Sequence, residues 1–160
     1  MIRAKIFQGR LRFYIAFFCL CSISTLSYSH EIKIDGKLND LSWESAEEYT
    51  KFYESFPFTL KSPTSFQKVL ILEDSDGIYF GFINQQKKEQ VRANKHERDD
   101  EMSNADKVGV SIDFDGNGLV AYSFSVSAGG SISDGIYRNE NEIKYDWDAD
   151  WKSDVFIDDD

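Results

Sequence analysis

The most regular pattern of hydrophobic and polar positions lies between Asp106 and Ser127. Apolar residues alternate there with small or polar residues on both sides of a Gly-Asn-Gly turn, which predicts two β-strands with one apolar face each. If both apolar rows face the same core, the strands pair as an antiparallel hairpin, and Gly116 and Gly118 supply the positive φ of the turn. A bulge at the turn is the alternative, and it would shift the register by one residue. The expected facing pairs are Val108 with Val126, Val110 with Phe124, Ile112 with Tyr122, and Phe114 with Val120.

Other short apolar or alternating segments, separated by turn residues, predict further strands. The unbroken apolar run Val69–Leu72 is typical of a strand that is covered on both faces. Regularly spaced short strands favour an all-β fold, an antiparallel β-sandwich of jelly-roll type. The additional strands are expected at His30–Lys37, Phe66–Glu73, Ile78–Asn84, Ser131–Arg138 and Trp151–Ile157. The second and third of these are expected to form a second hairpin across the turn Asp74-Ser75-Asp76-Gly77.

Three segments between these strands have a different character. Tyr49–Phe58 is rich in aromatic residues and is expected to be extended, whereas Gln85–Asn104 is densely charged and has no apolar stripe. The second of these is therefore expected to be a surface excursion with at most one helical turn. Asp40 is a candidate N-cap for one short helical turn. That turn would bury three apolar side chains, those of Leu41, Trp43 and Ala46.

Residues 1–29 have the features of a secretory signal peptide. Four basic residues precede an apolar run at residues 13–26, and the small residues Ser27 and Ser29 form a cleavage motif. We expect cleavage after Ser29, which leaves residues 30–160 as one exported domain; a short anchoring helix is the alternative. The apolar run is short for a membrane span.

Composition narrows the possible partners. The chain has 18 basic and 28 acidic residues and a net charge of −10, and removal of the four basic residues of the leader leaves 14 against 28, or −14. A surface this acidic argues against nucleic-acid binding, which requires Lys and Arg at the phosphates. Cys19 and Cys21 both lie in the leader, so no disulfide or thiolate chemistry is expected in the exported chain.

A saccharide site is suggested by the segment from Tyr145 to Trp151. Sugars bind to flat aromatic faces flanked by fixed polar groups, and strand alternation would place the aromatic residues on one face and Asp146, Asp148 and Asp150 on the other. Packing of the same aromatic rings in the core is the competing interpretation. The candidate ligand-binding residues are Tyr145, Trp147, Trp151 and Arg98, although Arg98 could instead pair with a nearby carboxylate.

A structural calcium ion is a second candidate. Asp113, Asp115 and Asn117, followed by Gly118, match the first half of an EF-hand loop. The bidentate Glu of such a loop would fall at position 124, which is Phe124, so an EF-hand is excluded. The alternatives are a metal-free turn or a calcium ion held by another acidic set, such as Asp146, Asp148 and Asp150. No other cofactor is expected.

No catalytic motif accompanies these candidates. The sequence lacks HExxH, G-x-S-x-G and a phosphate-binding loop, and its histidines are His30 and His96 only. No catalytic residue is therefore predicted. A glycosidase-like pair of carboxylates stays open as an alternative, because nothing singles out two of the many acidic residues.

Several motifs resemble, in their order, those of carbohydrate-binding module family 9-like domains. They include the opening IDGKLNDLSWESA, the IYFGF strand, the pair Arg98-Asp99 and a late Trp-Asp-x-x-Trp. The order is similar to the N-terminal part of bacterial outer-membrane proteins in which such a module precedes a large β-barrel.

The resemblance implies a non-catalytic, saccharide-binding sandwich in the periplasm or outer membrane of a Gram-negative bacterium. It also implies a continuation of the chain beyond Asp160, with the last strand or strands of the sandwich in it. Sugar-binding members clamp a sugar between two tryptophans, for which Trp147 and Trp151 are the candidates here. The alternatives are a structural domain that packs on a barrel without a small ligand, and part of a glycoside-active enzyme.

Overall fold

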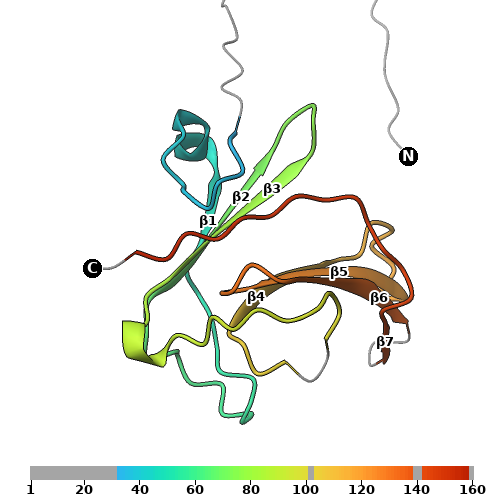
Figure 1. Cartoon of the computed structure of the whole chain (residues 1–160). Helices are drawn as coiled ribbons and strands as arrows, with labels where there is room; N and C mark the ends of the chain where they lie inside the picture. Colours follow the sequence, from blue (N-terminus) through green and yellow to red (C-terminus); the bar gives the residue numbers. More distant parts are fainter. Residues whose placement is uncertain (1–31, 101–102, 139–141, 159–160) are drawn as a thin grey trace, which may run out of the picture.

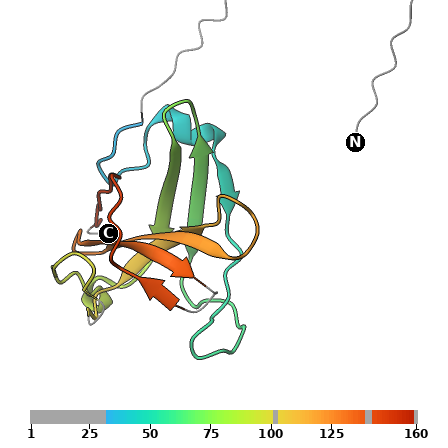
Figure 2. The ribbon, with the colours of Figure 1, turned by 90° about the vertical axis from the view of Figure 1, so that its right-hand side faces the viewer.

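The computed structural model describes residues 32–100, 103–138 and 142–158 and has two antiparallel sheets. The first has the order β1-β2-β3 and the second the order β4-β5-β6-β7. Their strands run in clearly different directions (Figures 1 and 2). The predicted all-β, sandwich-like fold is confirmed; the predicted signal peptide lies outside the described residues. The strands are β1 (Glu47–Tyr49), β2 (Gln67–Glu73), β3 (Ile78–Asn84), β4 (Lys107–Ile112), β5 (Val120–Ser127), β6 (Ile132–Arg138) and β7 (Glu142–Lys144).

The central hairpin has the predicted register over most of its length. Phe114 is the exception: β4 ends at Ile112, and the Phe114 side chain is 63% exposed, with its ring 5.6 Å from that of Tyr122. The strand ends there because the Asp113 carboxylate accepts backbone N–H groups of the following turn. The other seven apolar side chains of the pattern are half-buried. The confirmed pairs are Val108 with Val126, Val110 with Phe124, and Ile112 with Tyr122.

The first sheet carries the most deeply buried apolar cluster. The predicted second hairpin, β2 with β3, is confirmed, and Leu70 on β2 packs with Trp43 and Ile32. Gly81 faces Leu70 across the hairpin, and a Cβ at this position would lie 2.9 Å from the Leu38 side chain. The glycine therefore lets the N-terminal segment lie close against the sheet.

The N-terminal segment differs from the prediction in two ways. Residues 32–37 form no strand, because the Lys33 N–H donates to the Asp40 carboxylate (3.2 Å) and not to a neighbouring strand. The predicted turn exists as a 3-10 helix, η1 (Leu41–Ser45), but Asp40 makes no side-chain cap hydrogen bond there. Trp43 is buried as expected, whereas Leu41 is 58% exposed and its predicted burial is wrong.

Two predicted extended segments are mostly irregular. Only Tyr49, at the end of β1, is in a strand within Tyr49–Phe58. Trp151–Ile157 forms no strand, although Trp151, Ser153 and Val155 alternate with exposed neighbours. This segment runs beside the start of the domain, since a Cβ at Gly36 would lie 2.4 Å from the Phe156 nitrogen.

Over its described residues, 85–100 and 103–104, the charged excursion has the predicted form, with one short 3-10 turn, η2 (Lys88–Gln90). Its later residues lie against the second sheet, where the His96 N–H donates to the Ser131 hydroxyl (2.9 Å) and the Ser131 hydroxyl donates to the His96 carbonyl (2.8 Å). Among the described residues, none of the helical segments has the length and the apolar character of a membrane span.

Candidate functional site

The two faces of the second sheet differ in chemistry. The register of β4, β5 and β6 places Val110, Phe124 and Asp134 side by side on one face, the inner face. The opposite, outer face has small residues at the neighbouring positions, and Gly109 pairs there with Ser125, which in turn pairs with Ser133. The two faces therefore offer two different candidate sites.

The predicted tryptophan platform lies on the inner face. The Trp147 ring is 5.0 Å from the Tyr122 ring and 6.0 Å from the Phe124 ring, and the Trp151 ring is 5.6 Å from the Phe124 ring. Both tryptophans are half-buried, and the Trp151 indole nitrogen is buried with no hydrogen-bond partner. Their rings thus extend the aromatic layer of β5.

The predicted alternation of burial is present in this segment, but the prediction that its three aromatic residues share one face is wrong. Tyr145, Trp147 and Trp151 are half-buried, and the three aspartates between them are exposed. The structure separates Tyr145 from the tryptophans, however: the Tyr145 side chain lines a hollow on the outer face. The chain passes over the edge of the sheet between these residues.

Arg98 and the buried Asp134 form the polar centre of the inner face. The Asp134 side chain is fully buried, and its Oδ1 accepts hydrogen bonds from Arg98 Nη2 (2.5 Å) and Nε (3.0 Å). Its Oδ2 accepts the Ala149 N–H (2.6 Å). The pKa of the Arg98 guanidinium is raised, and the hydrogen bond to the Asp134 carboxylate is the largest cause. This pair therefore ties the excursion, β6 and the tryptophan segment together.

The same guanidinium lies among three converging carboxylates. Single oxygens of Asp99, Asp134 and Asp148 lie within 4.8 Å of one another, a spacing that could hold a cation. Arg98 Nε is 3.0 Å from Asp148 Oδ1 and 3.6 Å from Asp99 Oδ2. Since the three carboxylates already have a positive partner, a metal ion would have to compete with Arg98 for them.

The predicted calcium residues lie in the turn between β4 and β5. The Asp113 carboxylate accepts the N–H groups of Asp115 (3.1 Å), Gly116 (2.9 Å) and Gly118 (2.6 Å). These hydrogen bonds lower the pKa of the Asp113 carboxyl, and the bond from the Gly118 N–H has the largest effect. Asn117 Oδ1 accepts the Leu119 N–H (2.9 Å). The oxygens that would bind a metal thus hold the turn together.

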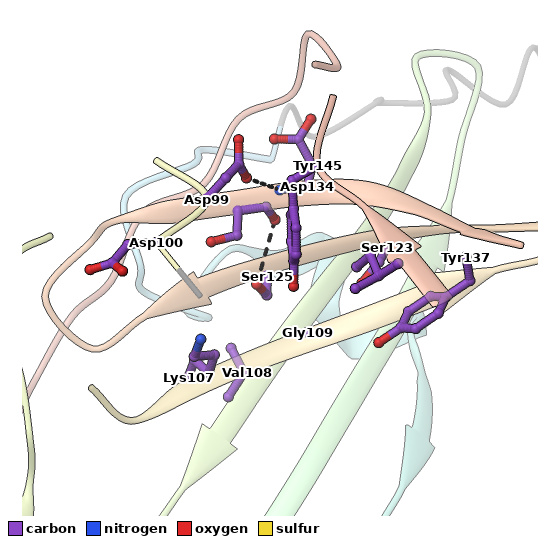
Figure 3. A pocket seen from close by; sticks show the side chains of 12 residues that line it. Asp99, Asp100, Lys107, Val108, Gly109, Ser123, Ser125, Asp134, Tyr137 and Tyr145 are labelled. Atoms are coloured by element: carbon purple, nitrogen blue, oxygen red, sulfur yellow. Dashed lines mark hydrogen bonds between the residues drawn. The ribbon is translucent and has the colours of Figure 1, made fainter. Parts of the chain in front are cut away.

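A hollow of about 230 Å³ lies on the outer face of the second sheet. Its floor is made of small residues (Gly109, Ser123, Ser125 and Ser133), and a Cβ at Gly109 would lie 2.9 Å from the Ser125 Cβ. Two tyrosines, Tyr137 and Tyr145, and Ile143 line it as well. In Figure 3, Ser123 and Ser125 lie between Tyr137 on one side and Asp99 and Asp100 on the other.

The excursion supplies the charged side of the hollow. Asp99 has a left-handed backbone (φ 59°), and its Oδ1 accepts the Asp134 N–H (2.8 Å) at the edge of β6 (Figure 3). Lys107, from the start of β4, also lines the hollow. Hydroxyl, carboxylate and ammonium groups therefore surround one concave surface that also has two tyrosine rings.

Sequence patterns did not indicate Asp134 as a site residue, nor any residue of the hollow other than Tyr145. The alternation in Ile132–Arg138 could have indicated Asp134, because it places this aspartate on the same face as Ile132 and Ile136. A carboxylate on such an apolar face is expected to be buried and to require a partner. Tyr137 and the serines occupy the other face of the same pattern. Their convergence with Asp99 depends on the path of the excursion, which no local pattern indicates.

Comparison with protein-family models, with curated proteins and with solved structures gives no match for this chain.

Proposed function

We propose that the chain is a non-catalytic binding module of an exported envelope protein and that it binds a saccharide in the hollow on the outer face of β4–β7. The observation that carries this proposal is the combination of two tyrosines with three serines and a charged rim on one concave surface. Aromatic faces pack against the C–H faces of sugars, and fixed polar groups bond to the hydroxyls.

The proposal moves the binding surface away from the tryptophans. Trp147 and Trp151 are in contact with Tyr122 and Phe124 on the inner face, and Arg98 already pairs with Asp134. A ligand that used these three side chains would have to displace contacts within the protein. Tyr145 is the one predicted ligand-binding residue that lines the hollow.

No metal ion is needed in this proposal. A structural calcium ion is the alternative for the three converging carboxylates, but Arg98 supplies the positive charge among them. Its guanidinium holds Asp134, and the Asp99 carboxylate bonds to the Asp134 N–H beside the hollow. We therefore assign Arg98 a positioning role for Asp99 rather than contact with the ligand.

Isothermal titration against a panel of mono- and oligosaccharides tests this function. We expect binding to at least one saccharide, and Tyr137→Ala is expected to weaken it about tenfold, which corresponds to roughly 1.4 kcal/mol. Tyr53→Ala is the matched control, because Tyr53 is an exposed tyrosine outside the hollow and its removal should leave affinity unchanged.

Two results would contradict the outer-face site. Binding that survives Tyr137→Ala but is lost in a folded Trp147→Ala variant would place the ligand on the tryptophan segment instead. The absence of heat across the panel would favour a second function, a structural domain that packs on a partner without a small ligand. The contact of Trp147 with two β5 aromatic rings is the observation that favours this second function.

A further inference from the structure

The loop between β1 and β2 exposes an unusual amount of apolar surface. Over residues 53–60, four large side chains are more than half exposed, and no other stretch of this length within residues 32–100, 103–138 and 142–158 has as many. Contiguous exposed apolar groups mark surfaces that meet another apolar phase. The four are Tyr53 (63%), Phe56 (94%), Phe58 (78%) and Leu60 (56%).

The loop has a defined shape and projects from the body of the protein. Its two sides are joined by backbone hydrogen bonds from the Glu54 N–H to the Lys61 carbonyl (2.8 Å) and from the Leu60 N–H to the Glu54 carbonyl (3.1 Å). Figures 1 and 2 both show this teal loop extending away from the two sheets, at the end opposite η1. The apolar side chains are therefore held on a convex tip.

Local backbone preference does not account for the leucine at the end of the tip. Leu60 has a left-handed conformation (φ 54°), which glycine adopts without strain and a side chain disfavours. The leucine side chain is nevertheless exposed, so neither backbone conformation nor burial in the domain explains why a leucine occupies this position. A contact of this side chain outside the domain would explain it.

Charge separates this loop from the rest of the chain. Residues 50–65 contain two lysines, Lys51 and Lys61, and one acidic residue, Glu54, so this stretch has a net charge of +1 in a chain of net charge −10. The Glu54 carboxylate accepts a hydrogen bond from the Thr59 hydroxyl within the loop. Aromatic residues flanked by lysines suit the boundary of a bilayer, where the rings enter the lipid and the ammonium groups stay in water.

We propose that the tip of this loop, residues 53–60, inserts into the interfacial layer of a lipid bilayer and holds the domain at a membrane surface. A bilayer accepts a convex apolar projection, and binding increases with the apolar area that enters it. A protein partner fits less well, since a stable interface involves roughly 20–30 residues on each side and the projecting tip has only eight. The inference does not depend on the saccharide site.

Fluorescence of the full chain with Phe56→Trp tests the proposal. In the presence of neutral phosphatidylcholine vesicles, which do not repel an acidic protein, the indole introduced at position 56 should shift its emission to shorter wavelength. Brominated lipid should quench this added emission at least twofold. Leu119→Trp is the matched control, because Leu119 is also 63% exposed but lies in the turn between β4 and β5; its added emission should not change.

A second chain, which combines Phe56→Trp with Phe58→Ser and Leu60→Ser, is expected to lose most of the quenching while its circular dichroism stays that of the parent. The proposal is overturned if the added emission at position 56 responds to vesicles no more than that at position 119, as it would for a loop that binds a protein instead. It is also overturned if quenching survives the two serine substitutions. A blue shift that occurs at high protein concentration without any lipid would show that the loop self-associates, and this result would also overturn the proposal.

Discussion

Two arginine–aspartate pairs attach the charged excursion to the second sheet, and they differ in their access to water. Arg98 binds Asp134, whose side chain is fully buried, whereas Arg92 binds Asp106, whose side chain is 24% exposed. Each pair has two guanidinium hydrogen bonds to one carboxylate oxygen. Geometry is thus similar in the two pairs, and solvent access is the main difference.

This difference determines what each pair contributes. Water can solvate Asp106 if its partner is lost, so the pair resembles a surface salt bridge of small net value. Asp134 has no such replacement, and an unpaired buried carboxylate carries its full desolvation cost. The excursion therefore depends mainly on Arg98 for its position, and so does Asp99 at the rim of the hollow.

The largest expected effect is that of Arg98→Ala. Among the described residues, this substitution leaves the buried Asp134 carboxylate with only the Ala149 N–H as a hydrogen-bond partner. We expect the free energy of unfolding to fall by about 3 kcal/mol. Urea denaturation followed by circular dichroism measures it. A loss below about 1 kcal/mol would show that Asp134 finds another partner or water.

The double variant Arg98→Met with Asp134→Leu serves as the control for that experiment. Replacing a buried pair by apolar side chains removes both the charge and its desolvation cost. Most of the stability lost in Arg98→Ala should therefore return. If the double variant is as unstable as Arg98→Ala, lost packing rather than an unpaired charge explains the effect.

A smaller effect is expected for Arg92→Ala. Asp106 keeps the hydrogen bond from Gln86 Nε2 (3.0 Å) and the backbone N–H of residue 92 (3.0 Å), and its carboxylate remains partly solvated. We expect a loss of about 1 kcal/mol or less in the same denaturation measurement. An equal loss for Arg92→Ala and Arg98→Ala would contradict the view that burial separates the two pairs.

The smallest effect is a dependence of stability on pH at Asp106. Burial alone would raise the pKa of this carboxyl, but hydrogen bonds from Arg92 and Gln86 outweigh it and lower the pKa from 3.8. A lowered folded-state pKa stabilises the protein above the ordinary value, and this contribution is lost as pH falls through the folded pKa. The stability difference between the wild type and Asp106→Asn should therefore shrink as pH falls below 3.8.

Urea denaturation of both proteins between about pH 6 and pH 2 measures this difference. Thr50→Ala, at an exposed position remote from Asp106 in sequence, is a suitable control and should show a difference that does not vary with pH. A difference between wild type and Asp106→Asn that grows toward acid pH would contradict the assigned direction of the pKa shift.

Local sequence patterns predicted β2 to β6 but neither of the short strands β1 and β7. Alternation on both sides of a glycine turn was enough for the β4–β5 register, and an Asp-Gly turn located β2 and β3. Prediction failed where a side-chain carboxylate accepts the backbone N–H groups that a neighbouring strand would otherwise bind. Asp40 accepts the Lys33 N–H within the segment expected as a strand, and Asp113 accepts N–H groups of the turn that ends β4 before Phe114.

The candidate site was predicted only in part, because its residues come together from segments that lie far apart in the chain. Tyr145 was identified because aromatic residues gather in its segment, and Asp134 could have been noticed as a charge between two isoleucines of β6. Nothing local to Arg98 indicates that its partner lies 36 positions later on the chain. Nor does any local pattern place Asp99 beside the serines of β5.

The sequence by itself determined the strands β2 to β6, the apolar face of the β4–β5 hairpin and the position of the two predicted hairpin turns, because these depend on side-chain period and on turn residues close in the chain. Only the tertiary structure decided which face holds the hollow, which aspartate is buried and how Arg98 is used. Those outcomes arise from contacts between distant segments, where the cost of burying a charge selects the partner.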